Sequence, residues 1–150
     1  MKSIFDSSTT EALVQRISNL RADANRAWGK MTPYQMVKHC ILSEEMYLGM
    51  TKYKRLFIGR LFGKMALNAM LKDATPIKKN EPTHPSFKIT GDGNFEQERA
   101  KWVELIKKYQ AAGEATFNDF IHPFFGKMDK QQVGVAVYKH VDHHLRQFGV

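Results

Sequence analysis

Apolar residues recur every three or four positions along most of this chain, and this helical period constrains its fold more than any other feature. No alternating run longer than a few residues competes with it, which excludes an extended sheet. The chain has 150 residues, the size of one compact domain, so we expect a single all-α domain over residues 1–150. Helices are expected near 9–22, 33–49, 94–111 and 129–148.

Each expected helix begins with a residue that can cap it, because a short polar side chain accepts hydrogen bonds from the free amides of the first turn. At Ser8, Thr32 and Asp129 the Glu or Gln three residues later predicts a capping box. Gly113 stands in the usual position just after the end of the third helix. Four helices of this kind predict a four-helix bundle. The starts are Ser8 with Glu11, Thr32 with Gln35, Asn94, and Asp129 with Gln132.

Between the second and third helices lies a long irregular connector, residues 51–92. Short helical pieces are expected at 56–58 and 65–71, interrupted by Gly59 and Gly63. Three prolines and two further glycines exclude a continuous helix in the second half of the connector.

Nearly all of the net charge of +8 falls within residues 51–80, which hold eight basic residues and one acidic residue. Such a patch can bind phosphate, an anionic lipid surface or an acidic small molecule, although a solvated, lysine-rich surface is the simplest interpretation. No RNA-recognition, helix-turn-helix or zinc-finger signature accompanies the patch, so we expect no nucleic-acid partner. The basic residues are Lys52, Lys54, Arg55, Arg60, Lys64, Lys72, Lys78 and Lys79.

The chain has one cysteine, Cys40, which rules out an internal disulfide framework and any cysteine-rich zinc module. No apolar stretch approaches the ~20 residues that span a bilayer, so no membrane insertion is expected. The N-terminal residues lack the apolar segment of a signal peptide. We therefore expect a cytoplasmic protein.

The helix expected at 129–148 contains the side chains most typical of a binding site. Its apolar stripe runs through Val133 and Val137. Steps of three and four residues continue that stripe into His140 and His144, so two imidazoles lie one turn apart on the inward face. Two imidazoles at this spacing can bind one divalent ion.

A third ligand has to come from another helix, and His39 is the best candidate because it shares the inner face of the second helix with Met36 and Tyr47. Three histidines leave a coordination position free for water or substrate, which is the arrangement of catalytic zinc sites. A lone histidine on such a face is more often a hydrogen-bonded core residue, and the pair at 140 and 144 can arise by chance. Both interpretations stay open on the residues alone.

Three other side chains are candidates for the periphery of the site. Gln147, one turn beyond His144, is placed to hydrogen-bond a ligand or bound solvent. His143 lies about 60° off the stripe, which favours the surface or the surroundings of the site over direct ligation. His122 precedes Pro123 and either lines the rim or shapes the turn.

Several segments resemble those of the DinB/YfiT-like superfamily, a group of four-helix-bundle metalloproteins. An M-x-x-H motif at Met36–His39 is followed by K-H-V-D-H-H-L-R-Q-F-G at the end of the chain. The fuller match is to a branch of unknown function, and it spans essentially the whole chain. The matching segments are Ser3–Asp6, Trp28–Thr32, His122–Gly126 and Tyr138–Gly149.

The resemblance implies that His39, His140 and His144 are the metal ligands, the same three that helix geometry selects. It also implies that the site binds a divalent ion, preferably zinc or nickel, and that the protein acts on a small-molecule substrate. Members of the family transfer or isomerise substrates with bacillithiol, mycothiol or glutathione, so a low-molecular-weight thiol is a candidate co-substrate. A homodimer is compatible with the family.

Three functions therefore remain under consideration. The leading one is a DinB-like metalloenzyme, either a metal-dependent hydrolase or a thiol S-transferase. The second is a non-catalytic protein that binds a metal or a small acidic ligand. The third is a basic interaction module in which residues 51–80 contact nucleic acid or another protein. The sequence identifies no catalytic residue beyond the candidate ligands.

Overall fold

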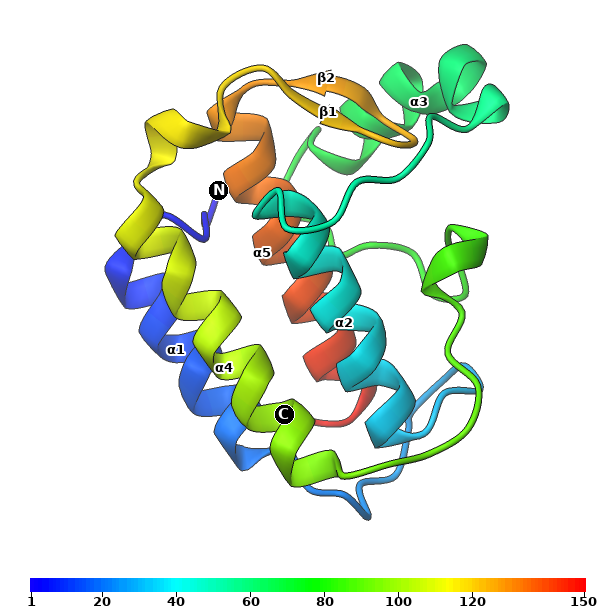
Figure 1. Cartoon of the computed structure of the whole chain (residues 1–150), viewed down its shortest axis with the longest axis vertical. Coiled ribbons are helices and arrows are strands. Elements are labelled where there is room, and N and C mark those ends of the chain that lie inside the picture. The colour runs from blue at the N-terminus through cyan, green and yellow to red at the C-terminus, as the bar shows by residue number, and fades with distance from the viewer.

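A computed structural model describes all 150 residues of the chain, and the predicted helical class is confirmed (Figure 1). Five α-helices are accompanied by two short 3-10 turns and one two-stranded sheet. No helix combines the length and the apolar content that crossing a bilayer requires. The helices are α1 (Ser7–Asn19), α2 (Pro33–Tyr47), α3 (Phe57–Met70), α4 (Phe95–Ala112) and α5 (Lys130–Gln147).

Four of these helices, α1, α2, α4 and α5, lie where the sequence predicts helices, and they enclose the core. α2 packs against α4 and α5, and α1 packs against the same two helices (Figure 1). The largest fully buried side chains, Trp102 and Tyr109, both come from α4. Removal of such apolar surface from water, worth roughly 25 cal/mol per Å², is the main force that holds the helices together.

Three of the four predicted helix starts are confirmed at the level of single hydrogen bonds. Capping boxes are present at Thr32 and at Asp129. The side chain of Asn94 accepts a hydrogen bond from the amide of Gln97 at 3.1 Å. Gly113 follows α4 with a φ of 73°, a left-handed value that favours glycine. Local sequence therefore sets where α2, α4 and α5 begin.

The capping box predicted at Ser8 is wrong. α1 begins at Ser7, and its N-cap residue is Asp6, whose side chain makes no capping hydrogen bond. The carboxylate of Asp6 instead accepts the amide of Ser3 at 3.1 Å. A tight turn at the start of the chain thus replaces the expected box.

The predicted interruption at Gly59 and Gly63 is also wrong, because α3 runs continuously through both. A Cβ atom on either glycine would overlap the backbone carbonyl of Phe124. Glycines four residues apart share one helix face, so this face lies directly on the neighbouring turn. The tertiary contact outweighs the low helix propensity of glycine, about 1 kcal/mol per residue.

That turn belongs to the small sheet, in which β1 (Phe120–His122) pairs antiparallel with β2 (Gly126–Met128). The ring nitrogen Nδ1 of His122 accepts hydrogen bonds from the amides of Phe124 and Phe125, each at 3.1 Å. His122 therefore fixes the turn on which α3 rests. The only regular element in the second half of the connector is a 3-10 turn, η1 (Pro85–Phe87); a second one, η2 (Glu114–Phe117), follows α4.

A carboxyl group, Glu44 of α2, is buried between α2 and α4 with 1% of its surface exposed. The hydroxyl of Tyr109 donates to its Oε2 at 2.5 Å, and its Oε1 has no hydrogen-bond partner. Burial raises the pKa of Glu44 to about 7, although the hydrogen bond from Tyr109 opposes the shift. The core therefore holds this group as a neutral acid below that pH.

We predict that the contribution of Glu44 to the stability of the protein decreases between about pH 4.5 and pH 7, because the folded state keeps the Glu44 proton where the unfolded state releases it. The contribution is intact below this window and is lost once the pH passes the folded-state pKa. A shift of this size corresponds to about 3 kcal/mol. Glu44→Gln keeps an acceptor for Tyr109 and removes the titration.

The measurement is the free energy of unfolding by urea at several pH values for both proteins. The difference between wild type and Glu44→Gln isolates this group, because all other titrations cancel. A difference that stays constant from pH 4.5 to pH 8 would show that Glu44 does not carry a raised pKa.

Candidate metal centre

Two packed helices, α2 and α5, bring the three predicted histidines together. His39 comes from the middle of α2, and His140 and His144 come from successive turns near the end of α5. One ring nitrogen of each lies within 4.8 Å of the others. The ring centroid of His39 is 5.2 Å from that of His140 and 4.8 Å from that of His144. The site thus joins residues a hundred positions apart in the chain.

The backbone of the connector fixes the protonation of His39. Its Nδ1 lies 3.0 Å from the carbonyl oxygen of Phe87, the last residue of η1. A carbonyl can only accept, so Nδ1 carries the proton and donates it. The other ring nitrogen, Nε2, consequently presents a lone pair to the centre of the cluster.

Two successive hydrogen bonds determine which ring nitrogen of His144 carries the proton. The amide nitrogen of Gln147 donates to the carbonyl oxygen of Trp28 at 2.9 Å, which orients the side-chain amide. The amide oxygen of Gln147 therefore faces Nδ1 of His144, at 3.0 Å, and accepts its proton. Nε2 of His144 is left unprotonated and available as a ligand.

His140 completes the cluster and has one unsatisfied atom. Its Nε2 lies 3.1 Å from Nε2 of His39, and its Nδ1 is buried without any partner. Because Nε2 of His39 is an acceptor, His140 must donate through its own Nε2. A buried ring nitrogen with no partner is uncommon and calls for an explanation.

Burial keeps all three imidazoles neutral at physiological pH. It lowers the pKa of His144 to about 3 and the pKa of His140 well below its ordinary value. Burial also lowers the pKa of His39, against the opposing effect of the Phe87 carbonyl. No carboxylate contributes to any of these shifts. Neutral imidazole is the form that binds metals.

The donor set fits a divalent ion. Two nitrogens bound to one tetrahedral zinc, each at about 2.05 Å, are separated by about 3.3 Å. The observed 3.1 Å between Nε2 of His39 and Nε2 of His140 is close to that separation. With their Nδ1 protons held by outer partners, His39 and His144 present Nε2 lone pairs, and together with His140 they could hold a metal ion.

Two of the predicted peripheral residues lie outside this cluster. His143 packs against Trp28, with ring centroids 5.4 Å apart. His122 stacks on Phe125 and uses its Nδ1 for the turn of the small sheet, so its main contacts are structural. Gln147 touches a cluster residue directly, through the hydrogen bond to His144.

Sequence reasoning missed two backbone groups that shape the site, the carbonyls of Phe87 and Trp28. The connector holds a local signal for the first, since His84 and Pro85 are typical of a short helical turn: the ring of His84 accepts the amide of Ser86 at 3.1 Å. No signal in the sequence indicates that this turn reaches His39. The position of Trp28 depends on the packing of the loop before α2.

The structure is that of a mostly helical protein with a buried cluster of three neutral imidazoles that can hold a metal ion. The family model described as DinB superfamily matches residues 6–148. The chain therefore belongs to the DinB superfamily, as its sequence motifs indicate. Neither the curated proteins nor the solved structures include a match to it.

We predict that the metal-free protein contains His39 and His144 with the proton on Nδ1, and His140 with the proton on Nε2. The carbonyl of Phe87 and the amide oxygen of Gln147 impose the first two states. Nitrogen-15 chemical shifts of the imidazole rings, measured by NMR between pH 6 and pH 8, distinguish these tautomers. Gln147→Leu keeps the size of the side chain and should release only His144 into a mixture of tautomers.

Proposed function

We propose that the protein is a metalloenzyme in which Nε2 of His39, His140 and His144 bind one divalent ion and leave at least one position open for a small-molecule reaction. The strongest support is that the unprotonated Nε2 atoms of His39 and His144 converge. Groups outside the cluster hold the protons on the Nδ1 atoms of the same two rings. Buried histidines of a purely structural core would also need partners for their N–H groups, but they would not need both free lone pairs to face one point.

The preferred ions are zinc and nickel, because imidazole suits both and the site contains no thiolate or carboxylate. When bound by three imidazoles with a position left open, a divalent ion lowers the pKa of a water or thiol there and so supplies a nucleophile at neutral pH. The chain places no negative charge at the cluster that would compete with such a nucleophile. Both a hydrolase and a thiol S-transferase are consistent with this arrangement.

A thiol used in such a reaction has to come from solution. The only cysteine, Cys40, is fully buried, and burial raises the pKa of its thiol well above the ordinary value. Its sulfur donates to the sulfur of Met36 at 3.7 Å, and the charge of the nearby Glu44 adds to the rise of the thiol pKa. We therefore assign the thiol, where one takes part, to a low-molecular-weight co-substrate.

We predict that replacing His39, His140 or His144 by Ala lowers zinc affinity by about a hundredfold or more, because each removes one of three ligands. Gln147→Ala should lower it by about tenfold, since only the orientation and basicity of His144 change. Isothermal titration of the metal-free protein with zinc measures both effects. Circular dichroism and thermal unfolding confirm that each variant is folded.

The matched control is His143→Ala, which removes an imidazole from the same helix but none of the three clustered nitrogens. Its zinc affinity should stay within a factor of about three of the wild type. Equal losses for His143→Ala and His144→Ala would mean that the three clustered histidines are not the specific ligands, and the proposed centre would be wrong.

We also predict metal-dependent turnover with a small nucleophile. The metal-loaded protein should accelerate the reaction of a low-molecular-weight thiol with monochlorobimane, or the hydrolysis of 4-nitrophenyl acetate. His140→Ala should abolish the acceleration by lowering the occupancy of the site. Stoichiometric zinc binding without either activity would favour the second function, a non-catalytic metal-binding protein.

A further inference from the structure

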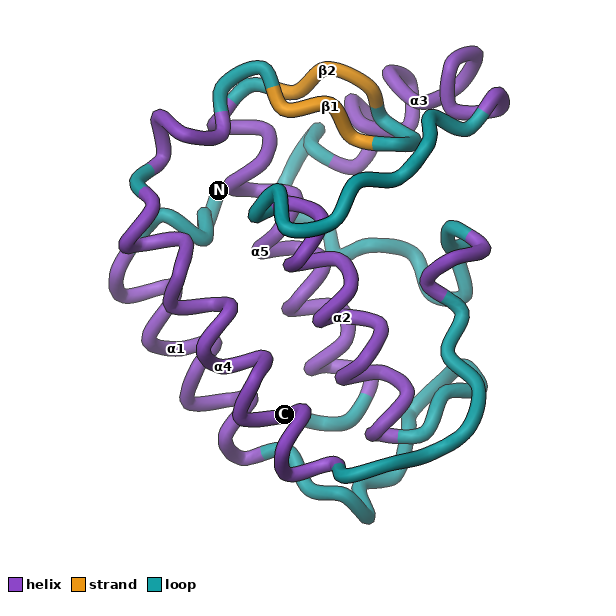
Figure 2. Tube along the Cα trace, viewed as in Figure 1, coloured by secondary structure: helices purple, strands orange, loops and turns teal.

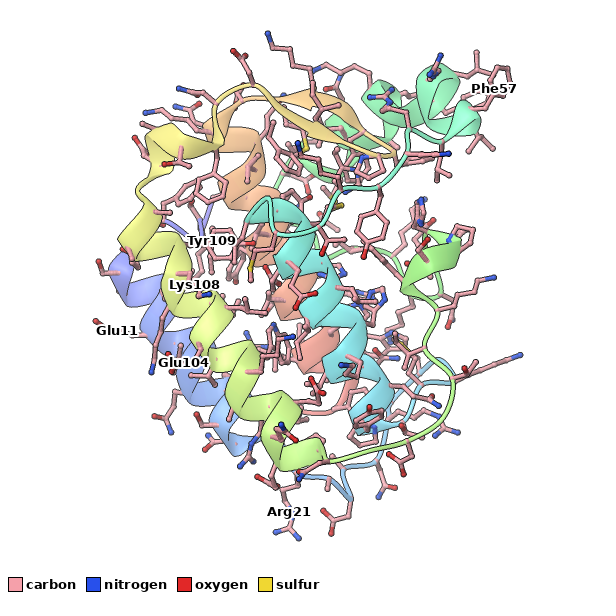
Figure 3. The ribbon with its side chains drawn as sticks, viewed as in Figure 1. Glu11, Arg21, Phe57, Glu104, Lys108 and Tyr109 are labelled. Carbon is pink, nitrogen blue, oxygen red and sulfur yellow. The ribbon has the colours of Figure 1, made fainter.

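Helix α3 exposes an apolar face to solvent. Of the eight large apolar side chains that are exposed in the whole chain, five belong to this one helix. Phe57, at its start, is 76% exposed and lies at the outer tip of the molecule (Figure 3). Isolated apolar residues at a surface are ordinary, but a continuous group of this size indicates an interaction surface. The five are Phe57, Ile58, Leu61, Phe62 and Met65.

The rest of the protein does not cover this face, because α3 uses its other side for packing. Gly59, Gly63 and Leu67 are buried, and their spacing of four places them together on one side of the helix. The exposed apolar residues occupy the opposite side. Figure 2 shows α3 outside the group formed by α1, α2, α4 and α5, at the edge of the molecule. The helix thus forms a ridge about 21 Å long, from its 14 residues at 1.5 Å each.

Basic side chains lie on one flank of this apolar ridge and in the segments before and after α3, and none of them forms an ion pair. No Asp or Glu occurs between Glu45 and Asp73. Arg60 and Lys64 lie next to the apolar residues within the helix itself. None of the exposed cations in or beside α3 forms a salt bridge. They are Lys52, Lys54, Arg60, Lys64 and Lys72.

We propose that α3 is an interfacial helix that attaches the protein to an anionic lipid surface. The helix lies in the plane of the membrane, with Phe57, Leu61 and Met65 among the acyl chains and Arg60 and Lys64 at the headgroups. An apolar face with unpaired cations beside it is the combination that such binding requires. No spanning segment is involved, in accord with the short length of the helix.

Charge and shape favour a lipid surface over a second copy of the chain. Two copies that met through α3 would place Arg60, Lys64 and their counterparts close together with no carboxylate in the segment to neutralise them. A ridge also needs a complementary groove on a protein partner. A lipid surface accepts a raised helix without one, and it supplies negative charge at the same depth as the cations.

The test is flotation of the full-length protein with vesicles of phosphatidylcholine alone and of equal parts phosphatidylcholine and phosphatidylglycerol. We expect binding to the anionic vesicles only, and weaker binding as salt is raised. Phe57→Ser with Leu61→Ser should reduce the partition coefficient at least tenfold, because two apolar side chains no longer leave water. Arg60→Gln with Lys64→Gln should reduce it about tenfold or more.

The matched control is Lys107→Gln with Lys108→Gln, which removes two charges from the exposed face of α4, where Lys108 lies far from α3 (Figure 3). Its partition coefficient should stay within about twofold of the wild type. All substituted residues are exposed, so the variants should keep the thermal stability of the wild type.

Three results would overturn the proposal. The first is an absence of binding, or equal binding to both kinds of vesicle. The second is binding that the double serine variant retains, which would show attraction of charges without insertion. The third comes from sedimentation velocity without lipid: a wild-type dimer that Phe57→Ser with Leu61→Ser converts to monomer would assign this face to a second copy.

Discussion

Burial of three imidazoles in one cluster, with no carboxylate beside them, is the constraint on which the centre of this molecule depends. Buried polar nitrogens need partners. Two of the outer nitrogens find them in the carbonyl of Phe87 and in the amide of Gln147, which the loop at Trp28 holds in turn. The cluster therefore requires the connector to close over the middle of α2 and the loop before α2 to close over the end of α5. Segments that look irregular in the sequence are what complete the site.

Local sequence predicts the helices well where capping and periodicity agree. The boxes at Thr32 and Asp129 form as expected, and the stripe through His140 and His144 faces inward because it continues an apolar one. The histidine cluster follows from the same periodicity plus one assumption, that α2 packs on α5. The family match supports the family assignment independently of that assumption. Periodicity sets which way a side chain faces, and packing sets what it meets.

The parts that sequence reasoning got wrong or missed are those that only tertiary contacts determine. Gly59 and Gly63 oppose a helix locally, yet both are needed for α3 to lie on the carbonyl of Phe124. Ser8 has the right neighbours for a cap, but the turn made by Asp6 and Ser3 starts the helix earlier. Sequence patterns do not indicate the role of the Phe87 carbonyl, because every residue has a carbonyl and only the fold brings this one to His39. Backbone groups are the least predictable members of a binding site.

The helix that holds two of the histidines also anchors α3. Lys139, which precedes His140, donates to the carbonyls of Met70, Asp73 and Thr75 at 2.6, 2.6 and 2.9 Å. These oxygens lie at and after the end of α3, so the helix is held at its end by α5 and along its glycine face by the small sheet. The helix that forms the apolar ridge is therefore already folded in the protein alone, before it binds a partner. The entropy of forming the helix is lost during folding, so it does not weaken binding to a surface, as it would for a segment that folds on contact.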